Sequence, residues 1–333
     1  MTTFQDCSFG LGVESTYGTG VTPTRWLEFG DTTLDYSKAV KQGAGLRVGS
    51  RVAREARRAI VTAQGAGDVT VDVITKGMGL LWQAAMGSGT STLVSAATYQ
   101  QVFTLADVLP SLTCQVGIPE VGGTVDAYTY LGCTADSFEL TFDNADILKL
   151  KTTLAAKDVT TATAYAAPSY STGANLLTFA GGSVYTGTLT APTATALASG
   201  ATPIAGVRGG SVSVNHNAAQ DRYNLGGGGR KDKPTVGLRD VSGALSVEYV
   251  DTTFRQAIMA DTSMSLVLTW TGAALGTGVE TLQVVVPAIR FEGSLPRPNA
   301  GNLILQDLKW TGLDNLTAAQ PLWVITRTAD AAL

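Results

Sequence analysis

The sequence predicts a mainly β protein with two similar domains in tandem, each a β-sandwich or barrel flanked by a short α-helix. Apolar and polar residues alternate along many segments, which is typical of half-buried strands. Charged residues make up only 15% of the 333 residues, unlike a disordered chain, and this low content favours extensive self-association. One strand–helix pattern occurs in each half of the chain, and the length suffices for two domains with their own cores.

The chain begins with a Gly-, Thr- and Ser-rich stretch, residues 1–25, which is expected to be an irregular N-terminal arm or an extended segment. Residues 26–29 and 33–36 predict a first strand or hairpin. The segment 43–66 follows as a basic arm or loop. Its arginines have two interpretations: a solvated loop or hairpin, or an arm that docks on an acidic surface of a neighbouring subunit. A second basic stretch, the Gly-rich segment 226–234, is expected to be a flexible loop. The basic residues concerned are Arg47, Arg51, Arg54, Arg57, Arg58, Arg230, Lys231 and Lys233.

The strand–helix pattern first occurs at residues 67–86. Three valines alternate there with three polar residues, which predicts a strand with one apolar and one wet face. The wet residues are Asp68, Thr70 and Asp72, and the valines are Val69, Val71 and Val73. After Thr75 the apolar residues recur at helical spacing, so a short helix is expected to cover the valine face.

The same pattern returns at residues 243–260. The strand alternates Leu245, Val247 and Tyr249 with polar or small residues, and residues 253–260 turn helical. The wet positions of this strand are Ala244, Ser246 and Glu248. The repeat indicates that one domain type occurs twice.

The remaining segments also alternate and predict strands. The clearest is a hairpin of 137–142 and 147–154 around a tight turn at 143–146. The other strands are expected at 99–105, 111–116, 128–131, 266–271, 281–286, 288–292, 303–310 and 322–327. Residues 155–175 are expected to be a linker, and the low-complexity stretch 186–206 a surface loop or hairpin tip.

Order and pattern therefore divide the chain into an arm at 1–25, a first domain at 26–165 and a second at 166–333. The aromatic pair of strands near residues 26–36 is expected to recur near 176–185, with Leu27-Glu28-Phe29 matching Leu177-Thr178-Phe179. Identity between the halves is low, so the duplication is inferred from the order of the parts.

No catalytic, metal or cofactor site is predicted. His216 is the single histidine and has no partner for metal binding or a triad, so a structural or solvent role is expected. The Gly-rich stretches lack the spacing of phosphate-binding loops. Three cysteines without metal spacing, Cys7, Cys114 and Cys133, predict reduced thiols in a cytosolic product, with Cys133 in a core strand. A net charge of −4 argues against a dedicated nucleic-acid binder, and no signal peptide or membrane-spanning run is present.

Several motifs in order resemble the tail tube (major tail) proteins of tailed bacteriophages, of the siphophage type. The similarity extends over nearly the whole chain. The motifs are Gly12-Val13-Glu14-Ser15-Thr16-Tyr17-Gly18-Thr19, Pro23-Thr24-Arg25-Trp26-Leu27-Glu28-Phe29, Lys76-Gly77-Met78-Gly79-Leu80-Leu81, Ser111-Leu112-Thr113-Cys114-Gln115-Val116-Gly117, Tyr128-Thr129-Tyr130-Leu131-Gly132-Cys133 and Asp221-Arg222-Tyr223-Asn224-Leu225-Gly226.

The resemblance implies tail-tube-type domains that assemble into stacked rings, with strands of all subunits forming one barrel around a channel for DNA ejection. Asp68, Thr70, Asp72, Ser246 and Glu248 would then face the lumen, where acidic and hydroxyl groups keep DNA from adhering. The basic segments would reach the next ring. Other implied partners are the tape-measure protein and the tail-tip and terminator proteins, in a virion tail assembled in the host cytoplasm.

Two questions remain open at the level of sequence. If each half supplies one tube domain, three chains would complete a pseudo-hexameric ring, whereas single-domain chains would number six. The chain could instead be a virion decoration protein or adhesin of β-sandwich fold that binds host glycans, or a hydrolase with an unrecognised site.

Overall fold

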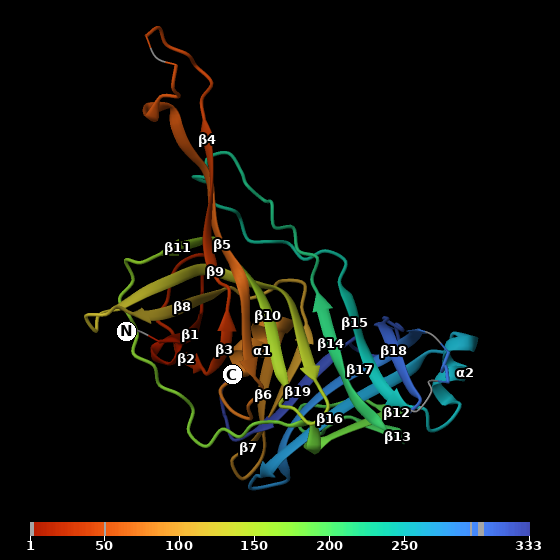
Figure 1. Ribbon diagram of the computed structural model, residues 1–333. Coiled ribbons are helices and arrows are strands. Elements are labelled where there is room, and N and C mark those ends of the chain that lie inside the picture. The colour runs from red at the N-terminus through yellow and green to blue at the C-terminus, as the bar shows by residue number, and fades with distance from the viewer. Residues whose placement is uncertain (1–2, 50, 294, 299–302) are drawn as a thin grey trace.

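The computed structural model describes residues 3–49, 51–293, 295–298 and 303–333, and it is mainly β, as predicted (Figure 1). The described strands form one antiparallel hydrogen-bonded network of 19 strands, and two α-helices of eight residues each pack against it.

Up to residue 160 the chain supplies β1–β11 and α1. Their bounds are β1 Ser8–Val13, β2 Arg25–Leu27, β3 Phe29–Thr32, β4 Asp35–Gln42, β5 Arg58–Asp72, α1 Gly79–Met86, β6 Gly87–Ser95, β7 Thr98–Leu105, β8 Leu112–Pro119, β9 Val125–Phe142, β10 Lys149–Ala156 and β11 Asp158–Thr160. Short 3₁₀ turns lie at η1 Phe4–Asp6 and η2 Glu55–Arg57.

From residue 179 onward the chain supplies β12–β19 and α2. Their bounds are η3 Phe179–Gly181, β12 Gly182–Thr190, β13 Ser199–Ile204, β14 Val207–Asn215, β15 Asp240–Glu248, α2 Thr253–Ala260, β16 Met264–Ala274, β17 Val279–Gly293, β18 Leu305–Gly312 and β19 Trp323–Thr328.

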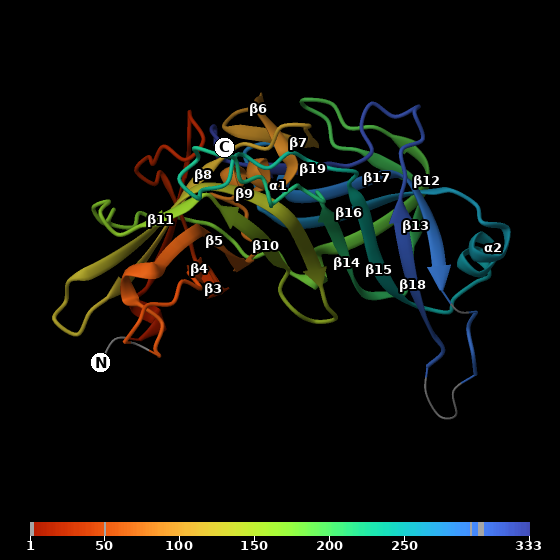
Figure 2. The same ribbon diagram turned by 90° about the horizontal axis from the view of Figure 1, so that it is seen from above.

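One sheet runs through both halves of the chain. Its strands follow the order β4–β5–β10–β9–β14–β15–β18–β17, with β3 continuing the line of β4 beside β5. The β9–β14 pair joins the halves, with Phe138 opposite Val214. We call this the through-sheet; Figure 2 shows it from above, from β5 at one end to β18 at the other.

The core lies between the through-sheet and an outer layer of helices and strands. The inward valines of β5, Val69 and Val71, and Val73 directly after the strand are each 1% exposed, as the alternation predicts. Trp82 of α1 packs edge-on against Phe138 of β9, and Phe254 of α2 packs in the same way against Phe291 of β17. Both helices thus cover the apolar face of the through-sheet, each in its own half.

Strand registers repeat between the two halves. In β5–β10, Asp72 lies opposite Lys149; in β15–β18, Glu248 lies opposite Leu305. The residue after each acidic side chain continues the ladder in the same way: Val73 N donates to Leu148 O, and Tyr249 N donates to Ile304 O. Residue 72 therefore corresponds to residue 248.

The irregularities of the strands repeat as well. The β3–β5 ladder shifts between Phe29 and Asp31, and the β14–β15 ladder shifts between Val207 and Gly209. Likewise, β8–β9 shifts between Leu112 and Cys114, and β16–β17 between Met264 and Leu266. Because a bulge is a specific local feature, its recurrence shows that β3 with β4 is the counterpart of β14, and β8 of β16.

Within the stretch 1–25, for which an irregular arm or an extended segment was expected, residues 8–13 are extended and form the buried strand β1 between β2 and β8. The glycines there serve close packing, because a Cβ on Gly10 would lie 2.9 Å from Cβ of Pro23. The register also corrects the expected match of residues 27–29 with 177–179, because Phe29 corresponds to Val207. Residues 186–206 lie largely in the β12–β13 hairpin.

Candidate functional site

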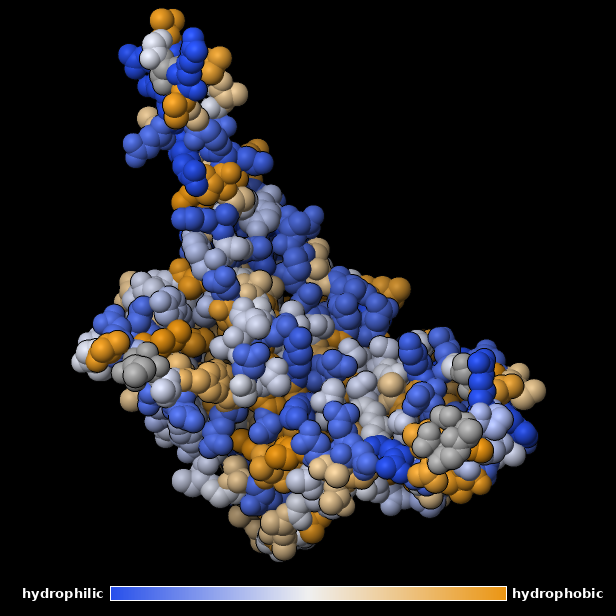
Figure 3. Space-filling model, in the orientation of Figure 1, coloured by the Kyte–Doolittle hydropathy of each residue, from blue (hydrophilic) through white to orange (hydrophobic). Residues whose placement is uncertain are grey.

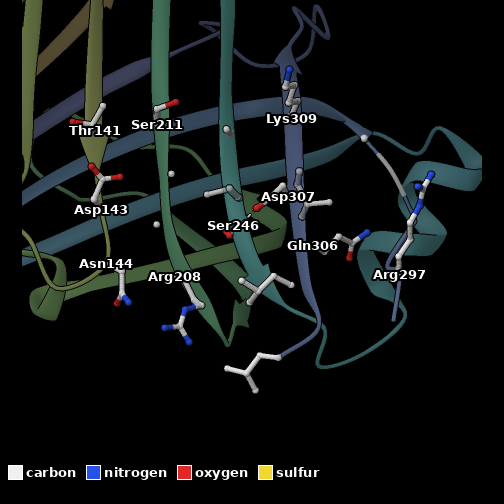
Figure 4. Close-up of a pocket in the computed structure, with 18 of the residues that line it drawn as sticks. Thr141, Asp143, Asn144, Arg208, Ser211, Ser246, Arg297, Gln306, Asp307 and Lys309 are labelled. Atoms are coloured by element: carbon white, nitrogen blue, oxygen red, sulfur yellow. Dashed lines mark hydrogen bonds between the residues drawn. The ribbon is translucent and has the colours of Figure 1, made fainter. Parts of the chain in front are cut away.

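The polar face of the through-sheet is hollowed. A hollow of about 1710 Å³ is lined by side chains of β9, β14, β15 and β18, among them Thr141, Ser211, Ser246 and Asp307 (Figure 4). These strands come from both halves of the chain, so the hollow spans the junction between them. The four residues just named occupy outward positions of the alternating strands, whereas inward residues such as Leu245 and Leu308 fill the core.

The five residues predicted to face a channel all lie on this polar face. Thr70 in β5 corresponds to Ser246 in β15, and Asp72 to Glu248, by the register given above. The Ser246 hydroxyl donates to Asp307 Oδ1 at 2.8 Å, and Arg208 Nη1 lies 2.8 Å from Glu248 Oε1. The structure thus brings both predicted sets onto one continuous surface.

Lysines of β10 and β18 share this face, and sequence reasoning missed them. Lys149, Lys151 and Lys309 lie opposite Asp72, Thr70 and Ala244. The alternation Lys149-Leu150-Lys151 in a predicted strand was the signal that could have placed the first two beside the β5 carboxylates.

Asp68 is the carboxylate most firmly held on this face. Lys151 Nζ lies 2.8 Å from Asp68 Oδ2, and the Thr153 hydroxyl donates to Asp68 Oδ1 at 2.8 Å. Partial burial raises the pKa of Asp68, but the hydrogen bonds from Lys151 and Thr153 and the lysine charge outweigh it and hold this pKa below its ordinary value. The face therefore carries paired charges of both signs.

A hairpin of β4 and β5 projects from the end of the through-sheet, and it is the most prominent feature of the molecule (Figure 1). We call its tip, residues 43–49 and 51–57, the arm tip. Leu46 and Val48 are 95% and 100% exposed there. Figure 3 shows apolar and strongly polar residues side by side at the tip. The predicted arm residues on this hairpin are Arg47, Arg51, Arg54, Arg57 and Arg58, all at the tip or directly after it and at least partly exposed.

The second basic loop, which connects β14 to β15, folds back on the protein. Gly229 O accepts from Ala63 N of β5 at 3.0 Å, and Arg230 forms an ion pair with Asp158 at 2.8 Å. Lys231 is only 2% exposed and donates to Gln220 Oε1 at 3.2 Å, and burial lowers its pKa. Lys233 is half-buried. The structure therefore separates these three residues from the arm tip.

Acidic residues gather at the opposite end of the strands from the arm tip. Strand β5 runs from Arg58 beside the tip to Asp72 at its far end, and the register places Glu248 at the same level in β15. The turns that leave this end carry further carboxylates. These are Asp143, Asp146 and Asp251. Two of these carboxylates are ion-paired, Asp146 with Lys149 and Glu248 with Arg208, so the end combines paired and unpaired acidic groups, whereas arginines predominate at the arm tip.

His216 directly follows β14, is buried, and forms hydrogen bonds through both ring nitrogens. Its Nε2 lies 2.7 Å from Ala85 O of α1, and its Nδ1 accepts from Arg239 Nε at 3.1 Å. Accepting at Nδ1 requires the neutral ring. Burial lowers the pKa of His216, and the hydrogen bond to Ala85 O opposes this shift.

The three cysteines are free thiols, and Cys133 lies buried in β9. Within the described ranges, no group of three or more His, Cys, Asp or Glu side chains is arranged to hold a metal ion. No helix in the described part of the chain is long and apolar enough to span a membrane.

The sequence was compared with models of known protein families, and one family matches. The sequence model of the family described as "Phage tail tube protein" matches residues 5–312, which is nearly the whole chain. No curated protein matches the chain.

Proposed function

The chain belongs to the phage tail tube protein family, and on that premise we propose that it polymerises into stacked rings that form the conduit for DNA ejection. As a member of this family it is a structural protein of the virion tail. The proposal adds that the hollow polar face of the through-sheet lines the channel, and that the covered apolar face points outward.

The observation that carries this proposal is the continuity of the polar face across both halves. A sheet that presents hydroxyls and paired charges along its whole width suits a wall past which a polyanion moves without binding. Carboxylates such as Asp72 and Glu248 repel phosphates, and two of the lysines on this face are paired with carboxylates, Lys149 with Asp146 and Lys151 with Asp68. We assign no catalytic role, cofactor or metal to this face.

The repeated registers support a ring of three chains. Each half contributes an equivalent set of strands to the through-sheet, so we treat the two halves, 26–165 and 166–333 with β1 added to the first, as two tube domains. Three chains then present six domains around the axis, with pseudo-sixfold symmetry.

The arm tip is proposed to join successive rings. Its arginines and exposed apolar side chains would meet the turns at the acidic end of the strands in the next ring, where Asp143 and Asp251 are exposed. An electrostatic contact of this kind fixes how one ring is aligned on the next more than it raises the affinity between the two rings. The further partners proposed are the tape-measure protein and the tail-tip and terminator proteins, with assembly in the host cytoplasm.

Negative-stain microscopy of the purified protein tests the proposal, together with native mass spectrometry of isolated rings. Tubes or rings with a central channel, and a ring mass of three chains, are expected. Monomers that do not assemble at any concentration would exclude a self-assembling tube and favour a decoration protein or adhesin. Six chains per ring would exclude the two-domain arrangement.

A further inference from the structure

We propose that two exposed strand edges of this chain form one seam between neighbouring copies, in the register that β9 and β14 show within the chain. One edge is the outer side of β3–β4, and the other is the C-terminal end of β17. The inference rests on the proposed function and specifies the contact within a ring.

The two edges lie at opposite ends of the through-sheet. Among the described residues, β3 and β4 pair with β5 alone, so their other side is open. At the other end, β16 covers β17 as far as Ile289, where Met264 is its partner, and the side of β17 beyond that residue faces no strand of the described chain. Both edges are exposed: Ser37, Glu292 and Gly293 all lie at the surface.

The β9–β14 pair supplies the template. Strand β8 covers β9 as far as Cys133, opposite Leu112, just as β16 covers β17 as far as Ile289. Beyond that point β14 takes over, with Asn215 opposite Ser137 and Val214 opposite Phe138. The edge that is open on β17 is therefore covered on its counterpart β9, where β14, the first through-sheet strand of the second half, pairs with it.

The register of the seam follows from the correspondence of residues. In the first half, Ser137 of β9 lies opposite Thr153 of β10, which in turn lies opposite Asp68 of β5. In the second half, Glu292 of β17 lies opposite Lys309 of β18, which lies opposite Ala244 of β15. Asp68 and Ala244 correspond by the register of β5 and β15 given above. Glu292 is thus the counterpart of Ser137.

On the other side of the seam, Asn215 lies opposite Asp240 and Ser37 opposite Gln64. Since residue 64 corresponds to residue 240, Ser37 is the counterpart of Asn215. The seam therefore sets Ser37 of one copy opposite Glu292 of the next, Tyr36 opposite Gly293 and Leu34 opposite Leu295. The last pair repeats the apolar contact of Val212 with Leu140.

The two helices give independent support. Every residue of α1 except Gln83 is buried, whereas in α2 only Phe254 and Ala257 are buried. Ala85, the seventh residue of α1, receives His216 from the end of β14. Met259, the seventh residue of α2, is 70% exposed. In the seam Lys38, which follows Ser37, takes the place of His216 and covers this side of α2.

The start of β18 is exposed in a similar way. Leu148, before β10, is fully buried, whereas its counterpart Ile304 is 40% exposed. Leu295, Leu303 and Leu305 are also exposed around this edge. Exposed apolar side chains gathered at one open edge indicate an interface rather than a free surface.

Two prolines limit the length of the seam. Pro296 and Pro298 follow Leu295 and have no N–H to donate, so the ladder is expected to end at Leu295. The same prolines hinder unregistered pairing of this edge before assembly.

Disulfide trapping tests the seam. Residues directly opposite in an antiparallel ladder have Cα atoms about 4.5–5.5 Å apart, which lies within the range a disulfide spans. The variant Ser37→Cys with Glu292→Cys is prepared in a Cys7→Ser background, assembled and oxidised mildly. Because the two positions lie on strands at opposite ends of the through-sheet, a disulfide between them joins two copies. The expected products are covalent oligomers that end at a closed ring of three chains.

The matched control is Lys38→Cys with Glu292→Cys, one residue out of register and on the other face of β4. We expect about tenfold less cross-linked product from it. Negative-stain microscopy of the same samples tests whether tubes form, independently of whether the seam forms as proposed. Tubes with no cross-link, or with equal cross-linking in both variants, would overturn the seam and leave the proposed function intact. A parent protein that forms neither rings nor tubes would overturn both.

Discussion

Gly67 in β5 and Gly243 in β15 occupy the same place in the two halves of the chain. A Cβ on Gly67 would meet the carbonyl oxygen of Thr33, and one on Gly243 would meet that of Ser211. By the strand registers Thr33 and Ser211 are themselves counterparts. Both halves thus bring neighbouring backbones together at a position that tolerates no side chain.

Either Gly67→Ala or Gly243→Ala is therefore expected to destabilise the chain, by at least about 1–3 kcal/mol, because the clashing atom is backbone. Denaturant unfolding of the unassembled protein measures the loss. Gly45→Ala at the arm tip is the matched control, since no atom lies within 4 Å of the added Cβ. Equal stability of Gly243→Ala and the control would contradict the backbone approach described here.

His216 predicts a pH dependence of stability. Its folded pKa lies below the ordinary value of 6.5, so the folded state binds fewer protons than the unfolded state below that pH. The stabilising contribution is complete above pH 6.5 and is lost as the pH falls from 6.5 toward the folded pKa, with a slope of at most about 1.4 kcal/mol per pH unit.

Unfolding free energies between pH 7 and pH 5 measure this effect. The groups around the ring are Arg239, Ala85 O and the Asp136 carboxylate, and protonation of Nδ1 would set it against the Arg239 guanidinium. The variant His216→Gln has no group that titrates in this range and should show a flat profile there. A wild-type profile that is equally flat would refute the role of His216.

Substitutions at the arm tip are expected to impair the stacking of rings without destabilising the folded chain. Arg51→Glu with Arg54→Glu should leave the melting temperature of the unassembled protein nearly unchanged, because Arg51 is exposed and Arg54 is partly exposed. Tubes should shorten to single rings, since the reversed charges would face the acidic ends of the strands in the next ring.

Tube lengths from negative-stain images give the measurement. The control is Arg51→Lys with Arg54→Lys, which keeps the charge and is expected to keep most of the tube length. Full-length tubes from the glutamate variant would show that these arginines do not join rings.

If the polar face lines the channel, a change of its charge should alter the rate at which DNA passes. With Asp72→Lys and Glu248→Lys, tubes should still form, because the Arg208–Glu248 ion pair is partly exposed and contributes little stability. Added positive charges along the channel should slow genome release from virions. The neutral variant Asp72→Asn with Glu248→Gln should have a smaller effect, and an unchanged release rate in the lysine variant would count against a luminal face.

The alternation of residues predicted much of the architecture because it reports the side on which each strand is buried. Val69 and Asp68 lie on opposite faces, as expected, and the strand–helix unit occurs twice. Pairing between distant strands leaves no such mark in the sequence. The ion pair of Asp68 with Lys151 depends on β10 lying beside β5, and the burial of Lys231 depends on a loop that crosses to the other half. The burial of the Gly-rich β1 was missed because glycines that permit close packing resemble those of a flexible loop.

Within the part of the chain that the structure describes, the projecting hairpin occurs in one of the two halves, since its counterpart after β14 folds back on the protein. A ring built from this chain would therefore carry arms on one side alone, and those arms would be three in number even though the wall is nearly sixfold. Such a ring has unlike top and bottom faces, so every stack of rings has a direction. A tube of this kind has one end that offers arms and one that offers their receptors, which allows a cap at each end to recognise its own terminus.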